Sequence, residues 1–278
     1  MTGTAMRFEF ATATRIVFGE GTAATLPELV RGFGARPLVV TGASAARAAS
    51  LTAALPSETF AVAGEPTVDL VREGALLARN AGCDVIVSIG GGSAIDAGKA
   101  IAILATNGSE PLEFLEVVGK GRALTIPPLP YIAVPTTAGT GSEVTRNAVL
   151  ASTQHSLKAS LRSPLMLARV ALVDPELTYA MPPTITAYTG LDALTQLIEP
   201  YVSARANPLA DAICLEGIPR VARALRRAFH DGADREARRE MALASLFGGL
   251  ALANAGLGVV HGFAAPLGGS FHAPHGAL

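Results

Sequence analysis

Formal charge is scarce in this chain, and the little that it has nearly cancels. Only 16% of its 278 residues are Asp, Glu, Lys or Arg, half are hydrophobic, and the net charge at pH 7 is −1. A composition with so much apolar surface to bury is typical of a compact globular protein of one or two domains. It provides no basic face for a phosphate backbone, since the densest basic group is Arg223, Arg226 and Arg227 on a predicted helix. We therefore expect no nucleic-acid partner.

Cysteine is nearly absent as well, and no targeting segment is recognisable. Cys83 and Cys214 match no metal or redox spacing, so we expect two buried free thiols in a reducing compartment. The first ten residues, MTGTAMRFEF, lack the basic and apolar regions of a secretory signal, which favours a cytoplasmic location. Residues 241–260 carry no charge and have the length of a membrane span. Because they include Ser245, Asn254 and four glycines, we predict a buried helix with a small-residue packing stripe, and no membrane partner.

Short β-branched runs alternate with helical patterns in the first part of the chain. We predict strands at residues 15–19, 37–41, 59–63, 85–89, 131–134, 144–150, 157–161 and 170–173, and helices at 21–33, 43–55, 67–81 and 94–104. Such alternation is typical of parallel βαβ units. From residue 174 onward the pattern is helical, at 185–188, 191–199, 207–229 and 234–255. The predicted fold class is an α/β domain with a parallel sheet at residues 1–174, followed by an all-helical domain at 175–278. The cleft between them is the expected active site.

The stretch DVIVSIGGGSAIDAGK, residues 84–99, has the pattern of a strand, a tight turn and a helix. A buried β-branched run is followed by three glycines, then by Ser93 as the expected helix N-cap and Asp96 as its capping-box acid. Free N–H groups and the helix dipole at such a turn form an anion site, which we interpret as a phosphate-binding turn for a nucleotide. The spacing is neither G-x-G-x-x-G nor that of a Walker A loop. A tight turn that binds nothing is the alternative.

A second run of small residues follows the strand predicted at 131–134. Six of the nine residues in PTTAGTGSE, residues 135–143, are Thr, Gly or Ser. Ligands of α/β sheets bind beyond the carboxyl ends of the strands, and these hydroxyls suit a carboxamide, a ribose or phosphate oxygens. An ordinary polar loop remains the alternative.

Metal-ligand types occur in the helical half. Asp192 and Gln196 are four residues apart and share one face of a predicted helix. His261, His272 and His275 lie further along the chain. A carboxylate with two imidazoles is a ligand set for ferrous iron or zinc that leaves positions open. Asp and His residues are more often structural, so these residues alone leave both interpretations open.

Five sequence blocks together resemble the iron-containing alcohol dehydrogenase family. They are GGGSAIDAGK, PTTAGTGSEVTRNAV, ALVDPELT, GLDALTQLIEP and VHGFAAPLGGSFHAPHG, in the family's order. The resemblance extends from about residue 15 to the last residue. It implies a dinucleotide-binding α/β domain, a helical domain and NAD(P)-dependent interconversion of a small alcohol and its carbonyl compound.

The resemblance also implies roles for individual residues. The cofactor, NAD or NADP, would contact Gly91, Gly92, Ser93, Asp96, Thr136, Thr137, Thr140 and Lys158. The glycines and Ser93 would hold its pyrophosphate, and the three threonines would lie near its nicotinamide end. The metal, Fe²⁺ or alternatively Zn²⁺, would be held at the positions of Asp192, Gln196, His261 and His275. There it would act as a Lewis acid on the alcohol oxygen.

Four departures from the family pattern affect these expectations. Gln196 stands where metal-dependent members have a histidine, so we expect weaker metal binding. Ala265 replaces a second histidine near the substrate and removes a proton-relay group. Gly42 replaces the acid of NAD-preferring members, which leaves room for the 2′-phosphate of NADP, with Arg47 the nearest basic residue. Family members also continue well beyond the position of His275, so the helical domain is expected to be incomplete.

Residues 241–278 contain no Asp, Glu, Lys or Arg. So apolar a segment should be covered, either by further helices or by another subunit, and we expect a homodimer. Two other functions remain open. A maleylacetate-reductase-like enzyme, which needs no metal, is favoured by Gln196. A remnant that binds the cofactor without catalysis is the third hypothesis.

Overall fold

The computed structural model describes residues 6–42, 46–155, 157–271 and 273–278. Six parallel strands form one sheet in the order β1-β8-β5-β4-β2-β3. Their bounds are β1 Arg15–Phe18, β2 Pro37–Gly42, β3 Glu58–Val62, β4 Val85–Gly90, β5 Tyr131–Pro135 and β8 Val170–Val173. The predicted parallel α/β sheet is therefore confirmed, and β8 has the bounds that the sequence predicted.

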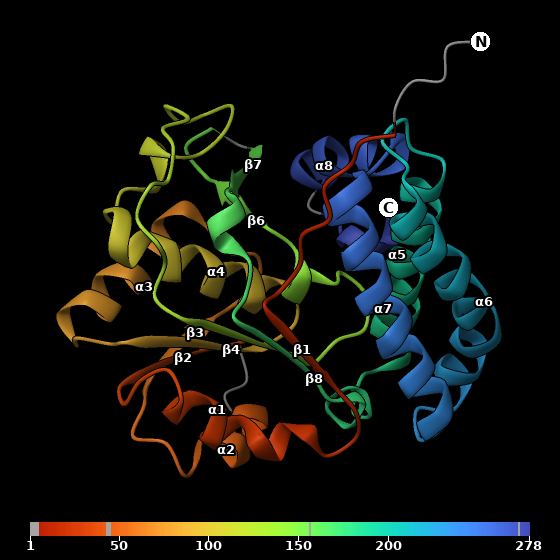
Figure 1. Cartoon of the computed structure of the whole chain (residues 1–278), viewed down its shortest axis with the longest axis horizontal. Helices are drawn as coiled ribbons and strands as arrows, with labels where there is room; N and C mark the ends of the chain where they lie inside the picture. Colours follow the sequence, from red (N-terminus) through yellow and green to blue (C-terminus); the bar gives the residue numbers. More distant parts are fainter. Residues whose placement is uncertain (1–5, 43–45, 156, 272) are drawn as a thin grey trace.

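Helices cover both faces of this sheet (Figure 1). The helices α1 (Leu26–Arg31) and α2 (Ala46–Thr52) lie on one face, and α3 (Val68–Asn80) and α4 (Gly92–Asn107) lie on the other. Alternate residues of β4 point to the two faces, since Val87 packs with α1 and α2 while Ile86 packs with α3 and α4. The central strand is thus buried on both sides, which its β-branched run predicted.

Two predicted elements of the α/β half begin later than expected. The helix predicted at 21–33 starts with a 3₁₀ turn, Thr22–Thr25, before α1. The strand predicted at 144–150 starts only at residue 147, because Ser142–Val144 form another 3₁₀ turn. The strand β6 (Asn147–Ser152) pairs antiparallel with β7 (Leu157–Arg162), and this hairpin stands apart from the main sheet.

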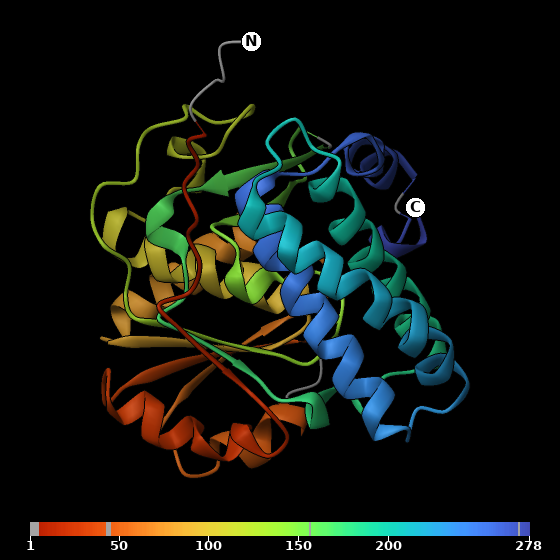
Figure 2. The ribbon, with the colours of Figure 1, turned by 45° about the vertical axis from the view of Figure 1, so that its right-hand side comes forward.

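Long helices make up the second half. The helices α5 (Pro183–Tyr201), α6 (Pro208–His230) and α7 (Arg235–Ala255) pack around a shared apolar core (Figure 2). The two helices predicted at 185–188 and 191–199 are in fact one, α5. Gly190 lies inside it, where a side chain would collide with Leu225 and Met241, so this glycine serves helix packing and does not end the helix.

Gly256 ends α7 with a φ of +75°, and the chain then turns into α8 (Val259–Phe271) and the 3₁₀ turn His275–Ala277. The sequence pattern did not predict α8. Within the described residues, no single helix has the length and apolarity of a membrane span; only α7 and residues 259–268 taken together, with a bend of 91°, meet that test.

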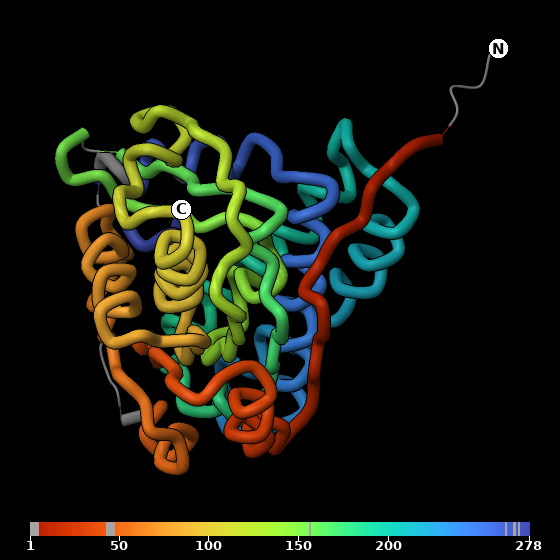
Figure 3. Tube along the Cα trace, turned by 60° about the vertical axis from the view of Figure 1, so that its left-hand side comes forward, coloured from red at the N-terminus to blue at the C-terminus, as the bar shows by residue number. Residues whose placement is uncertain are grey.

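The segment before β1 crosses the helical half (Figure 3). The Asn254 side chain on α7 pairs with the backbone of Ala11, accepting from its N–H at 2.7 Å and donating to its carbonyl at 3.0 Å. An amide side chain in the uncharged stretch thus has a structural partner 243 residues away. The last strand ends at Val173, and the predicted domain boundary at residue 174 stays a prediction.

Candidate functional site

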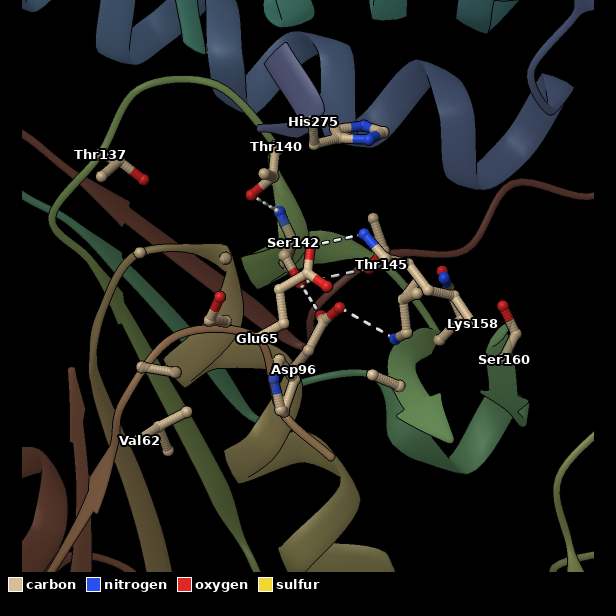
Figure 4. A pocket seen from close by; sticks show the side chains of 18 of the residues that line it. Val62, Glu65, Asp96, Thr137, Thr140, Ser142, Thr145, Lys158, Ser160 and His275 are labelled. Carbon is tan, nitrogen blue, oxygen red and sulfur yellow. Dashed lines mark hydrogen bonds and ion pairs between the residues drawn. The ribbon is translucent and has the colours of Figure 1, made fainter. Parts of the chain in front are cut away.

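A cavity of about 670 Å³ lies between the sheet and the helical half. Its lining comes from the turn after β4, the loop after β3, the loop after β5, the β6–β7 hairpin, and residues of α5, α7, α8 and the last 3₁₀ turn. In Figure 4, Asp96 lies on the α/β side and His275 lies beside the helices of the second half. Both halves of the chain therefore contribute to one cavity.

The glycine turn differs in detail from the prediction. Helix α4 begins at Gly92 with Gly91 as its N-cap, and no side chain of the described residues caps it. The prediction that Ser93 caps the helix and that Asp96 is its capping-box acid is therefore wrong. The extended backbone of Gly91 (φ −76°, ψ −174°) lets the helix start two residues earlier. Gly91, Gly92 and Ser93 line the cavity, so the start of α4, where a helix has free N–H groups, belongs to the cavity wall.

The loop after β5, residues 136–143 and called the threonine loop from here on, lies directly against this turn. A Cβ at Gly91 would lie 3.3 Å from Thr137 Cγ2, and one at Gly92 would lie 2.9 Å from Thr140 Cγ2. Only glycine allows such an approach at the second position. Thr137 and Thr140 line the cavity, whereas Thr136 is buried outside the lining, where its N–H donates to the Gly90 carbonyl at 2.9 Å.

Asp96 joins the two walls instead of capping a helix. Its carboxylate accepts from the Ser142 hydroxyl of the threonine loop and, at 3.0 Å, from the Val149 N–H of the hairpin. Asp96 and Ser142 both line the cavity. An acid expected to act locally thus bonds to groups 46 and 53 residues away.

Lys99, which the sequence patterns did not indicate as a site residue, lies beneath the same wall. Its ammonium donates to Ser142 Oγ at 2.9 Å, Thr145 Oγ1 at 2.8 Å and the Asn147 carbonyl at 2.6 Å, and lies 3.3 Å from Asp96 Oδ1. Burial lowers its pKa, and the neighbouring Asp96 carboxylate opposes that shift. The sequence carried one signal: Lys99 is the only charged residue between Asp96 and Glu110 in an otherwise apolar helix.

Lys158 on β7 also lines the cavity, and it forms an ion pair with Glu65 of the loop after β3. Glu65, which lines the cavity too, was not among the predicted residues. Gly42, the end of β2, lines the cavity, and within the described residues nothing lies within 4 Å of the place of a Cβ there. The side chain of Arg47, its expected basic neighbour, lies outside the described part of the structure.

Three predicted metal ligands come together from three elements. Asp192 on α5, His261 on α8 and His275 on the last 3₁₀ turn place one ligand atom each within 4.8 Å of one another. Asp192 Oδ1 lies 3.2 Å from His261 Nε2 and 3.6 Å from His275 Nε2. His261 and His275 line the cavity, with the buried Asp192 behind them. His272 and the side chain of Ala265 lie outside the described residues.

Gln196 completes the group one helical turn after Asp192. Its Nε2 donates to Asp192 Oδ1 at 3.0 Å, and its buried Oε1 has no hydrogen-bond partner among the described residues. A half-turn of the carboxamide exchanges its oxygen and nitrogen, and so offers Oε1 to the same place. A carboxylate, two imidazoles and an amide oxygen without a partner form a donor set that fits a divalent metal ion.

His261 is held between two carboxylates. Its Nδ1 lies 2.6 Å from Glu199 Oε2, on the side away from Asp192. Burial disfavours its charged form, but hydrogen bonds to Asp192 and Glu199 outweigh burial and raise the pKa of His261. Sequence analysis did not single out Glu199, although its position seven residues after Asp192 puts both on one face of α5.

Comparison with known proteins covers nearly the whole chain. Residues 13–175 match the family model for iron-containing alcohol dehydrogenase, and residues 186–278 match that for the C-terminal region of the Fe-containing alcohol dehydrogenase family. Alcohol dehydrogenase 4 of Schizosaccharomyces pombe is 45% identical over 76% of this chain and 49% of its own length. Long-chain-alcohol dehydrogenase 1 of Geobacillus thermodenitrificans is 42% identical over 77% and 54%. The chain thus spans about half the length of these relatives.

Solved structures agree with the observed arrangement. The crystal structure of a 1,3-propanediol oxidoreductase superposes with a TM-score of 0.90 at 36% identity, over 98% of this chain and 72% of the other. A sulfoacetaldehyde reductase from Bifidobacterium kashiwanohense, solved in complex with NAD⁺, superposes with a TM-score of 0.91 at 33% identity, over 98% and 74%. With both family models matched in order and the fold shared from end to end, this chain belongs to the iron-containing alcohol dehydrogenase family.

Proposed function

We propose that this protein is an NAD(P)-dependent oxidoreductase that interconverts a small alcohol and its aldehyde or ketone by hydride transfer. A divalent metal, Fe²⁺ or Zn²⁺, would polarise the substrate oxygen. One observation carries the proposal: a single cavity is lined both by the uncapped start of α4 and by the two histidines of the Asp192 cluster. A nucleotide and a metal-bound substrate would therefore share one cavity.

The α/β wall offers the groups that a dinucleotide needs. The N-terminus of α4 at Gly91 and Gly92 would bind the pyrophosphate through backbone N–H groups. The Thr137 and Thr140 hydroxyls would orient the nicotinamide end, with Lys158 as a further contact. Gly42 lines the same cavity and has no side chain, so it would admit the 2′-phosphate of NADP as well as the 2′-hydroxyl of NAD.

The helical wall offers the groups that hold a metal and shield the reaction. Asp192, His261, His275 and the Gln196 amide oxygen would be the ligands. When bound, a divalent metal supplies Lewis acidity that lowers the pKa of an alcohol. Leu252 and Leu257 line the same cavity and would exclude water from the path of the hydride.

The test combines metal content with turnover. We expect wild type purified without oxygen to contain Fe²⁺ or Zn²⁺ and to oxidise NADH or NADPH with members of a panel of small aldehydes and ketones. Asp192→Ala removes the only carboxylate of the cluster and should reduce both metal content and turnover, turnover by at least about 100-fold. A wild type without metal whose turnover is unchanged by this substitution would contradict the metal-dependent reaction.

Gln196→His tests the ligand set from the opposite direction. An imidazole is a better ligand for Zn²⁺ than an amide oxygen, so this variant should bind Zn²⁺ at least about tenfold more tightly. Competition with a coloured chelator measures the affinity. Equal affinities in the two proteins would show that position 196 does not reach the metal.

A metal-free reductase is the second candidate. The hydrogen bond from Gln196 to Asp192 favours it, because this bond gives the Asp192 carboxylate a donor in the absence of a metal. Such an enzyme would reduce a carbonyl compound with no bound Fe or Zn and would keep its activity in a strong chelator. An inert cofactor-binding protein would differ from both, because NADH fluorescence would shift on binding while no carbonyl compound in the panel is reduced.

A further inference from the structure

Glu199 contacts His261 of the Asp192–His261–His275 group but is not one of the proposed ligands. It lies on α5, two turns after Asp192, with a side chain that is 6% exposed. Oε2 lies 2.6 Å from His261 Nδ1, and Oε1 accepts the Val260 N–H at 2.7 Å. Glu199 therefore bonds both to an imidazole and to the backbone at the start of the helix that carries it.

These contacts decide which nitrogen of His261 faces the cluster. A neutral imidazole has one N–H, and a carboxylate beside Nδ1 keeps the hydrogen there. When a metal ion is bound, Nε2 would carry the lone pair that ligates it; in the structure Nε2 lies 3.2 Å from Asp192 Oδ1. A carboxylate that accepts from a ligating histidine also makes its other nitrogen a stronger donor to a metal.

We propose that Glu199 is a positioning residue of the metal centre. It holds His261 in one tautomer and one ring orientation, and it anchors the first turn of α8 so that Nε2 faces Asp192 and His275. This inference rests on the proposed function, since it assumes that the cluster binds a metal. Gln196 leaves only two imidazoles among the donors. Metal affinity should therefore depend more strongly on the orientation of each imidazole.

Gly258 provides an independent way to disturb the same contact. A Cβ at this position would lie 2.9 Å from Glu199 Oε1, and its backbone φ lies outside the left-handed region. Because the colliding atom is the end of a flexible side chain, Gly258→Ala should displace the Glu199 carboxylate while the fold and the charge of the site are retained.

The experiment compares three variants of the 278-residue chain. Glu199→Gln keeps the shape of the side chain and removes its charge, and Gly258→Ala moves it. Asp174→Asn is the matched control: Asp174 is also a buried carboxylate that accepts two backbone N–H groups, from Ala23 at 2.9 Å and Glu176 at 3.0 Å. It lines neither the cavity nor the cluster.

Zn²⁺ affinity is measured by competition with a coloured chelator, and the absorption bands of bound Co²⁺ report the ligand geometry. We expect Glu199→Gln and Gly258→Ala to weaken Zn²⁺ binding by about 10- to 100-fold and to alter the Co²⁺ spectrum. Asp174→Asn should change neither. In Zn²⁺-loaded protein labelled with ¹⁵N, the Nδ1–H signal of His261 should be lost or displaced by Glu199→Gln, which a loss of stability alone does not cause.

The outcomes separate this inference from the function on which it rests. If wild type binds Zn²⁺ and both Glu199→Gln and Gly258→Ala bind it equally well, Glu199 does not position the ligand, and the proposed function stands. If wild type binds neither Zn²⁺ nor Co²⁺, the metal-dependent function and this inference are both wrong. Should Glu199→Gln not fold, an unchanged Zn²⁺ affinity in Gly258→Ala still overturns the inference.

Discussion

At the scale of single residues, two buried ionisable side chains support the α/β wall of the cavity. Lys99 is 1% exposed and Glu143, at the end of the threonine loop, is 3% exposed, and the two interact electrostatically. The Lys99 ammonium donates hydrogen bonds to oxygen atoms of three cavity-lining residues. Buried charges of this kind are costly unless paired, so their removal has a predictable direction.

Replacing Lys99 by methionine should lower the free energy of unfolding by about 3 kcal/mol, because Asp96 and three oxygen acceptors lose their partner inside the protein. Urea denaturation measures the change. Lys120→Met is the control, since Lys120 pairs with Glu113 at the exposed surface, and it should change the free energy by less than about 0.5 kcal/mol. Equal losses in the two variants would contradict the structural role given to Lys99.

Glu143 predicts a pH dependence of stability. Burial raises its pKa from 4.5 to about 7, against the opposing effect of Lys99. The folded chain thus keeps this proton to higher pH than the unfolded chain does. The contribution of Glu143 to the free energy of unfolding is therefore largest below pH 4.5 and is lost as the pH rises through 7. Between pH 5 and 7.5 this contribution falls by about 2 kcal/mol.

Glu143→Gln removes this dependence. Its free energy of unfolding relative to wild type should rise by about 2 kcal/mol from pH 5 to pH 7.5, measured by urea denaturation at both values. A difference between the two proteins that stays constant with pH would show that Glu143 ionises normally in the folded chain.

At the scale of elements, the threonine loop meets α7 backbone to backbone. Gly141 has a φ of +57°, and a Cβ at Gly249 would lie 2.2 Å from the Gly141 carbonyl oxygen. The preceding glycine of the same helix, Gly248, faces Gln196 on α5. The small-residue stripe predicted at 241–260 is confirmed in α7, where both glycines are buried. This contact sets the distance between the threonine loop and the helical half.

Gly249→Ala should destabilise the fold by about 3 kcal/mol, because the colliding atoms belong to the backbone and cannot move aside. NADH affinity should fall too, since Thr140 is next to Gly141. Gly262→Ala in α8 is the control: in the part of the chain that the structure describes, nothing lies within 4 Å of the place of its Cβ, and alanine favours a helix. Thermal melting and NADH fluorescence measure both variants, and unaltered melting of Gly249→Ala would contradict the close approach.

At the scale of the whole molecule, the uncharged C-terminal stretch divides into two parts. Its α7 portion is largely buried, as predicted. Along α8 the large side chains Val259, Phe263 and Phe271 are exposed by 69%, 63% and 74% within this single chain. Apolar surface of this kind on one helix is typical of an interface. The homodimer predicted from the sequence stays a prediction, and α8 is the face that we expect it to use.

We expect the purified chain to self-associate at micromolar concentration, and Phe263→Ser with Phe271→Ser to weaken that association at least about tenfold. Sedimentation equilibrium measures both proteins. Leu215→Ser, at an exposed leucine of α6, is the control and should leave the association unchanged. A wild type that remains monomeric would contradict an α8 interface.

Local pattern was sufficient for much of this architecture. β-branched runs predicted the strands, and three consecutive glycines predicted the turn before α4, because strands and turns depend on residues close together in the sequence. The order of the sequence blocks predicted the family. The positions of Asp192, His261 and His275 were predicted from family resemblance, and the structure brings them together. Their metal-binding role stays a prediction.

Only the tertiary structure decided which partners the buried polar groups have. Asp96 was expected to cap its own helix, yet it bonds to Ser142 46 residues away, and Glu199 holds a histidine 62 residues further along the chain. Sequence spacing determines which residues share a strand or helix face, since those periods are local. A buried charge instead needs whichever donor or acceptor the fold brings within about 3 Å, and that follows from packing between distant segments.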